Sequence, residues 1–173
     1  VKESESIQYE VGRIVEKRPA TGESAVQIIL FQSLLARDKF EWVLQKGTEG
    51  GVSVFVPMQA ERSLLRAKYV DDDRLDRWRR ILTEAAEQSH RGRVPQIESP
   101  TTLAEAVMQH KQFSRFLIAA TSGKTLSLKE ALAGDQPPES VAILVGPEGG
   151  FTDEETNLAI EKGATAVHFG PRI

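Results

Sequence analysis

The chain has 173 residues, of which 40% are hydrophobic and 27% charged, and its formal net charge is −3. This composition is typical of a folded protein with a hydrophobic core and excludes a disordered chain. Because there is no cysteine, disulfides, thiolate ligands and cysteine nucleophiles are excluded, and three scattered histidines predict no metal site. No apolar run approaches the roughly 20 residues of a membrane span and no secretory leader is present, so we expect a cytoplasmic protein without a membrane anchor.

The N-terminal segment is predicted to be separate from the rest. Ile7, Tyr9 and Val11 alternate with polar residues, which predicts a strand, and 18–22 is rich in turn-forming residues, which predicts a linker. The first residue is not methionine, and the final residues 170–173 form a loop directly after a predicted strand. We therefore expect the chain to be part of a longer protein.

After the linker, short apolar runs alternate with helical patterns. The longest helix is predicted at 72–88, where Leu75, Trp78 and Leu82 are spaced three and four apart. Other helices are expected at the capping-box pairs Asp38–Glu41, Thr102–Glu105 and Thr152–Glu155, and at 126–133. Strands are expected at 25–31, 52–56, 116–120, 141–145 and 165–169.

This alternation predicts an α/β fold with a parallel sheet and helices on both faces. Pro57 is expected to end the second strand, because proline cannot donate to a strand ladder. The aromatic residues on apolar faces are expected in the core: Phe40, Trp42, Trp78 and Phe116.

Charge is distributed unevenly along the chain. Residues 62–93 carry nine Lys/Arg against six Asp/Glu, whereas residues 146–161 carry five acids and no base. The basic stretch is compatible with an anionic partner and equally with a solvated helix face.

Parallel sheets bind ligands beyond the carboxyl ends of their strands. Three segments qualify, at 120–123, 146–151 and 170–172. In the second, Gly146, Gly149 and Gly150 allow positive φ and close approach of a ligand to the main chain. No lysine follows, and the acids at 153–155 would repel a polyphosphate, so an uncharged or cationic ligand with a purine edge fits better. The alternative is a tight turn with no ligand.

Residues 144–155, Leu-Val-Gly-Pro-Glu-Gly-Gly-Phe-Thr-Asp-Glu-Glu, resemble a signature of the SPOUT superfamily of knotted RNA methyltransferases. Within it, the match is to the bacterial 16S ribosomal RNA uridine-N3 methyltransferases. The resemblance covers about residues 26–173, with Gly50 standing where the family usually has leucine. Supporting segments lie at 45–52, 57–63, 77–95 and 168–173.

The resemblance implies a SPOUT domain over 21–173, with a C-terminal trefoil knot. It also implies that residues 1–20 are the end of an N-terminal PUA-like RNA-binding domain and a linker. The implied partners are 16S ribosomal RNA of the small ribosomal subunit and a second copy of the chain, in a homodimer. No metal is implied.

The cofactor implied by the resemblance is S-adenosylmethionine, with Leu144 and Val145 lining the adenine pocket. The residues carried over as cofactor contacts are Thr121, Leu144, Val145, Gly146, Glu148, Gly149, Gly150, Gly170, Arg172 and Ile173.

The implied reaction places the nucleophile at N3 of an unpaired uridine, whose anion spreads its charge onto O2 and O4. A cationic or amide donor beside these oxygens would stabilise the anion. The candidate catalytic residues are Arg62, Gln88, Arg91 and Arg172. For each arginine the alternative is a surface ion pair, and for Gln88 a partner for backbone groups at a helix end. Glu49 is either a general base or a carboxylate that caps a neighbouring loop.

Two other functions remain open on the sequence. One is a SPOUT methyltransferase that acts on another RNA or another base. The other is a noncatalytic RNA-binding protein with the same fold.

Overall fold

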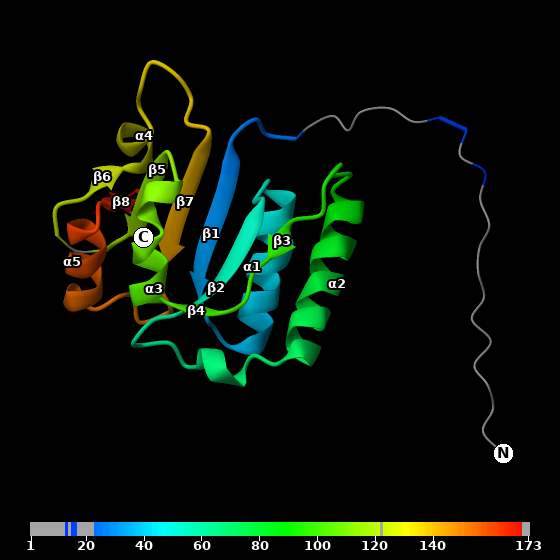
Figure 1. Cartoon of the computed structure of the whole chain (residues 1–173), viewed down its shortest axis with the longest axis horizontal. Coiled ribbons are helices and arrows are strands. Elements are labelled where there is room, and N and C mark those ends of the chain that lie inside the picture. The colour runs from blue at the N-terminus through cyan, green and yellow to red at the C-terminus, as the bar shows by residue number, and fades with distance from the viewer. Residues whose placement is uncertain (1–12, 14, 17–22, 122, 171–173) are drawn as a thin grey trace.

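The computed structural model describes residues 13, 15–16, 23–121 and 123–170, and in these residues one sheet of eight strands forms the centre of the molecule (Figure 1). Every strand pair is parallel, and the order is β3-β2-β1-β7-β5-β8-β6, with β4 also paired to β2. The predicted α/β class is confirmed. The strands are β1 (Gln27–Ser33), β2 (Val54–Gln59), β3 (Gln96–Ile97), β4 (Thr101–Thr102), β5 (Arg115–Ala119), β6 (Leu126–Ser127), β7 (Ser140–Val145) and β8 (Thr165–His168).

Helices cover both faces of the sheet, as predicted (Figure 1). Alternation along β1 separates two cores: Ile28 and Leu30 pack with α1 and α2, while Ile29 and Phe31 pack with α3 and α5. The helices are α1 (Arg37–Glu49), α2 (Asp72–Gln88), α3 (Leu103–Met108), α4 (Leu128–Ala131) and α5 (Asp153–Glu161), with 3-10 turns η1 (Ala67–Tyr69) and η2 (His110–Gln112). The strand predicted at 7–11 and the linker at 18–22 lie outside the described residues.

The core between α1 and α2 contains an aromatic pair. The rings of Phe40 and Trp78 lie 4.5 Å apart at an interplanar angle of 36°, and both side chains are almost fully buried. The prediction for Trp42 is wrong, because this side chain is 61% exposed. Phe40 and Leu44 are one turn apart and point inward, so residue 42 projects from the opposite side of α1.

Helix starts follow the predicted caps with one exception. Capping boxes form at Thr102 with Glu105 and at Thr152 with Glu155. Helix α1 instead starts after Ala36 without a side-chain cap, so Asp38 lies inside its first turn. Glu41 accepts hydrogen bonds from Arg77 of α2 at 2.6 and 2.8 Å. The helix predicted at 126–133 is shorter, since its first two residues pair with β8 and a further capping box at Ser127 starts α4.

Strand β2 continues through Pro57, contrary to prediction. The Phe55 carbonyl accepts from Glu98 on the β3 side, and the Met58 carbonyl accepts from Leu34 on the β1 side. Alternation therefore turns the Pro57 nitrogen toward the gap between β3 and β4, where no ladder bond is needed.

The two tryptophans provide a test of this packing. We expect Trp78→Ala to destabilise the protein by about 3–5 kcal/mol, because a large buried ring leaves a cavity. The matched change Trp42→Ala should stay within about 0.5 kcal/mol, since it removes an exposed side chain. Urea unfolding followed by circular dichroism measures both values. Equal effects would contradict the placement of the two rings.

Candidate functional site

A pocket opens where the carboxyl ends of β5, β7 and β8 meet. It has a volume of about 640 Å³, and its walls include Thr121 after β5, residues 146–151 after β7, and His168 and Phe169 at the end of β8. Because β5 lies between β7 and β8, parallel pairing brings these three chain segments together. The three strand ends singled out in the sequence therefore form one site.

Gly146 and Gly150 of the 146–151 loop are each required for a different structural reason. Gly150 has φ of +68°, and its N–H donates to the Pro147 carbonyl at 2.8 Å, which closes a tight turn. At Gly146 a Cβ would lie 3.2 Å from the Phe151 nitrogen and 3.3 Å from the Gly150 carbonyl carbon. All three loop glycines allow positive φ, but only Gly150 adopts it. Gly146 is required by the close approach of the loop to itself.

Side chains from the other half of the sheet hold this loop from outside. Lys39 of α1 forms an ion pair with Glu148 at 2.8 Å. Arg62, in the turn after β2, donates through Nη1 to the carbonyls of Gly149 at 2.7 Å and Phe151 at 3.3 Å. The positively charged side chains that contact this loop thus come from segments distant in sequence.

The hydrogen bond from Lys39, and then one from its own backbone N–H, lower the pKa of Glu148 below its ordinary value of 4.5. Glu148 is therefore ionised at neutral pH and places a negative charge at the rim of the pocket.

A family model described as RNA methyltransferase domain matches residues 22–173. The chain belongs to this family. The ribosomal RNA small subunit methyltransferase E of Bacillus subtilis is 31% identical over 168 residues, which cover 92% of this chain and 64% of that protein. The protein of the same name from Synechocystis sp. is 32% identical, with 96% of this chain and 54% of that protein covered. The chain thus spans less than two thirds of the length of these relatives.

Solved structures of the family superpose on the same fold. The ribosomal RNA small subunit methyltransferase E of Neisseria gonorrhoeae, bound to S-adenosyl methionine, has 34% identity and a TM-score of 0.78, with 88% of this chain and 61% of that chain covered. A protein of Legionella pneumophila in complex with the cofactor SAM has 32% identity and a TM-score of 0.79, with 87% and 61% covered.

Most of the cofactor contacts implied by the family resemblance line the pocket. These are Thr121, Val145, Gly146, Glu148, Gly149 and Gly150. Leu144 does not, because alternation along β7 turns it into the core, where it is fully buried. Gly170 follows the pocket wall with φ of +112°, and its N–H donates to Nδ1 of His168 at 3.1 Å. Arg172 and Ile173 lie outside the described residues.

Several residues that line the pocket are not among the predicted cofactor contacts. Phe151 and Thr156 belong to the glycine loop and α5, and His168 and Phe169 end β8. Phe169 is 44% exposed at the rim. A signal for the last two was present, since they precede Gly170 at a strand end that had been chosen as a ligand site.

Of the four candidate catalytic residues, the structure brings Arg62 to the loop and does not bring Gln88 or Arg91. Arg91 is at the amino end of β2, where its guanidinium pairs with Glu23 at 2.8 Å and donates to the Val52 carbonyl at 2.6 Å. This network lowers the pKa of Glu23, chiefly through the hydrogen bond from Arg91. Arg91 therefore ties the start of β1 to β2, a structural role.

Gln88 is exposed at the end of α2, in a shallow groove with Trp42 and Arg77. Glu49 pairs with Lys46 at 2.8 Å within α1. In α2, Arg77 pairs with Glu41 and Arg79 with Asp76. The ion pairs of Arg77 and Arg79 favour the interpretation of the basic stretch at 62–93 as a solvated helix surface.

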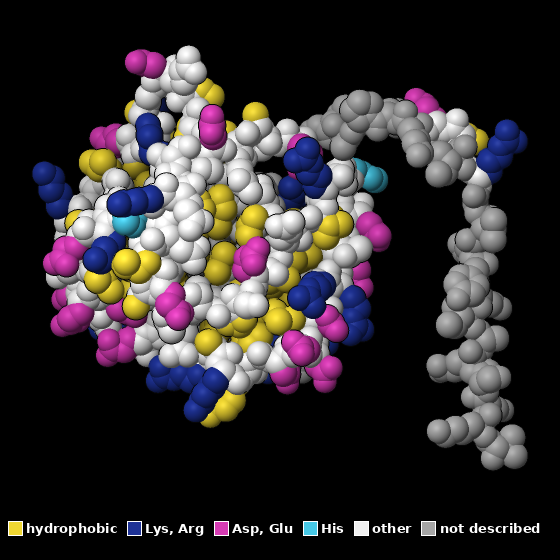
Figure 2. All heavy atoms as spheres, in the orientation of Figure 1, with side chains coloured by type: hydrophobic (Ala, Val, Ile, Leu, Met, Phe, Trp, Pro, Cys, Tyr) yellow, Lys and Arg dark blue, Asp and Glu magenta, His cyan; other side chains and the backbone are white. Residues whose placement is uncertain are grey.

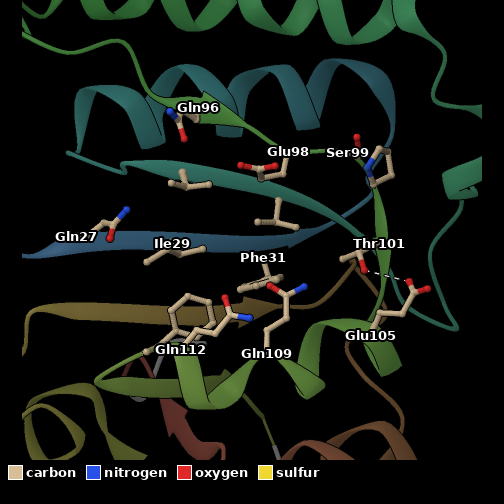
Figure 3. Close-up of a pocket in the computed structure, with 14 residues that line it drawn as sticks. Gln27, Ile29, Phe31, Gln96, Glu98, Ser99, Thr101, Glu105, Gln109 and Gln112 are labelled. Carbon is tan, nitrogen blue, oxygen red and sulfur yellow. Dashed lines mark hydrogen bonds between the residues drawn. The ribbon is translucent and has the colours of Figure 1, made fainter.

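A second hollow of about 700 Å³ lies on the sheet face between α3 and the β3–β4 segment (Figure 3). Figure 2 shows hydrophobic side chains gathered there, over β1 and β2. Its floor includes Ile29 and Phe31, and its rim carries glutamines and the carboxylates of Glu98 and Glu105. No Lys or Arg lines it among the described residues, so it does not suit an RNA strand.

The described residues contain no cluster of three or more His, Asp or Glu side chains that could hold a metal ion. Within the same part of the chain, no helix is long and apolar enough to cross a membrane.

The ion pair at the pocket rim gives a pH-dependent prediction. Because the folded-state pKa of Glu148 is lowered, its contribution to stability is complete above the ordinary value of 4.5 and is lost as the pH falls through the folded value. Lys39→Gln should raise the pKa of Glu148, as measured by NMR titration of its carboxyl carbon. Lys46→Gln, which removes a lysine from the same helix, should leave it unchanged. The effect on stability should be small, because both partners are solvent-exposed.

Proposed function

We propose that the protein transfers a methyl group from S-adenosylmethionine to N3 of a uridine in 16S ribosomal RNA of the small ribosomal subunit. The observation that carries this proposal is the pocket at three strand ends, built on the glycine loop, in a family with a solved structure bound to S-adenosyl methionine. The names of the relatives support ribosomal RNA of the small subunit as the substrate. The base and the atom rest on the resemblance of residues 144–155.

The pocket suits this cofactor in volume and chemistry. A pocket of about 640 Å³ is large enough for an adenosine joined to an amino acid, as in S-adenosylmethionine. The main chain of the 146–151 loop can pair with an adenine edge, because glycines leave it uncovered. The ionised Glu148 at the rim is paired with Lys39, and its partly exposed carboxylate can also face a positively charged ligand. When bound, S-adenosylmethionine supplies a methyl group on a positively charged sulfonium.

The chain's own residues would bind and orient the reactants. Thr121, Val145 and the glycine loop would hold the nucleoside, with His168 and Phe169 on the third side. Gly170, the next residue, remains a predicted contact. Leu144 would act only through packing beneath the pocket. Arg172 and Ile173 remain predicted contacts. For stabilising the uridine anion, Arg62 and Arg172 remain candidate donors, and Arg62 lies beside the loop.

The finer architecture is also part of the proposal. A C-terminal trefoil knot would place the residues after Gly170 against the pocket, and the catalytic domain would span 21–173. Residues 1–20 would end an N-terminal PUA-like RNA-binding domain. A homodimer in the cytoplasm, without metal, completes the assignment. The greater length of the relatives supports the presence of further segments in the natural protein.

Methylation of another RNA or base is the nearest alternative, because the pocket argues for the cofactor more strongly than for the substrate. A noncatalytic RNA-binding protein would need no intact cofactor pocket, so cofactor binding separates it from an enzyme.

Calorimetry with S-adenosylhomocysteine on the full-length protein tests the pocket. We expect a dissociation constant below the millimolar range for the wild type. Gly146→Ala should weaken binding about tenfold or more, because its Cβ displaces Gly150 and Phe151. The control Gly134→Ala lies away from the pocket, where a Cβ would meet a flexible Arg115 side chain at 3.4 Å, and should change nothing. A folded wild type that fails to bind would refute methyl transfer.

The substrate is tested by mapping N3-methyluridine in 16S ribosomal RNA from cells that lack the gene. We expect one mark to disappear and to return on expression of the wild type but not of Gly146→Ala. Persistence of every such mark would leave the cofactor assignment intact and reject this substrate.

A further inference from the structure

The turn at 60–63 is attached to the glycine loop across the sheet. Arg62 Nη1 donates to the carbonyls of Gly149 and Phe151, at 2.7 and 3.3 Å. The side chain also lies flat on the loop, since a Cβ placed on Gly149 would be 3.4 Å from Arg62 Cδ and 3.7 Å from its Cβ. One arginine therefore lies against Gly149 and occupies two of the loop's carbonyl oxygens.

A second contact joins the same two segments. The Glu155 carboxylate accepts from the Thr152 N–H at 3.0 Å, as part of the cap of α5. Its other oxygen accepts from the Glu61 N–H at 2.7 Å. The start of α5 and the 60–63 turn are thus bridged by one carboxylate, immediately beside the arginine contact.

The turn that carries Arg62 is itself well anchored. Ser63 is buried, its Oγ accepts from the Ala60 N–H at 3.0 Å, and its own N–H donates to the Ala60 carbonyl at 3.1 Å. Ala60 is also buried, directly after β2. The arginine therefore extends from a fixed base at the carboxyl end of a central strand.

A loop of three glycines and one proline has many accessible conformations, and binding a ligand to it requires that one be selected. Charge-assisted hydrogen bonds to the loop carbonyls order the loop in advance, so less conformational entropy is lost when a ligand binds. We infer that Arg62 is a positioning residue, which holds the 146–151 loop in the shape that binds the cofactor. This inference rests on the proposed function for the identity of the cofactor.

The competing role for Arg62 is direct contact with the RNA, as the sequence alone suggested. Its Nε and Nη2 form no hydrogen bond within the described part of the chain, so they could contact an RNA ligand while Nη1 holds the loop. A positioning role predicts a change in the loop and in cofactor affinity. A substrate role predicts a change in RNA affinity alone.

The first experiment needs no ligand. Hydrogen–deuterium exchange of the unliganded full-length protein is compared for wild type, Arg62→Ala, Arg62→Lys and Arg66→Ala. We expect faster exchange of peptides covering 146–153 in Arg62→Ala, a smaller effect in Arg62→Lys, and none in Arg66→Ala. Arg66 is an exposed arginine a few residues on, without a side-chain partner among the described residues. Unchanged exchange in Arg62→Ala would overturn the inference.

The second experiment measures affinities of the same variants. Arg62→Ala should raise the dissociation constant for S-adenosylhomocysteine and the KM for S-adenosylmethionine about tenfold, with partial recovery in Arg62→Lys. The RNA dissociation constant should change less than about twofold. A selective loss of RNA affinity would assign Arg62 to the substrate and overturn the inference. If the wild type binds no cofactor, the proposed function fails, and the exchange data still decide whether Arg62 orders the loop.

Discussion

The position of β7 between β1 and β5 is the constraint on which the site depends. Parallel pairing on both sides aligns the carboxyl ends of these strands at one edge of the sheet. The loop after β7 consequently lies between the end of β5 on one side and the turn after β2 on the other. A glycine loop anywhere else in the sheet would lack one of these neighbours.

The charge of the site is assembled from segments far apart in sequence. Residues 146–161 contain five acids and no base, so their like charges would repel one another if left alone. Asp153, Glu154 and Glu155 lie in the first turn of α5, where negative charge interacts favourably with the helix dipole. Lys39 and Arg62 supply the missing positive charge from α1 and from the turn after β2. The Glu148 carboxylate at the pocket rim is paired with Lys39 and remains partly exposed to the pocket opening.

The two cores support different parts of the site. The core of α1 and α2, built around Phe40 and Trp78, fixes β1 and β2 and hence the turn that carries Arg62. The core of α3 and α5 supports β5, β7 and β8, which carry the pocket. Because β1 contributes to both cores, the 60–63 turn and the pocket keep a fixed geometry relative to each other. Arg91 strengthens the first core from the far end of the sheet, through Glu23 and the Val52 carbonyl.

The sequence by itself determined the fold class and the longer helices and strands, because helix periodicity, capping boxes and apolar runs are local patterns. The two-residue strands β3, β4 and β6 were not predicted, because only pairing with β2 and β8 defines them. The sequence also located the three strand ends, since ligand sites in parallel sheets follow from strand direction alone. Tertiary structure decided what depends on neighbours: that Pro57 continues a strand, that Trp42 faces outward and that Glu41 serves α2 rather than a cap. It also decided which arginine reaches the loop. Arg62 comes directly after β2, whereas Arg91 comes after α2 and lies at the amino end of β2 in space. Only strand pairing tells which of the two adjoins the glycine loop.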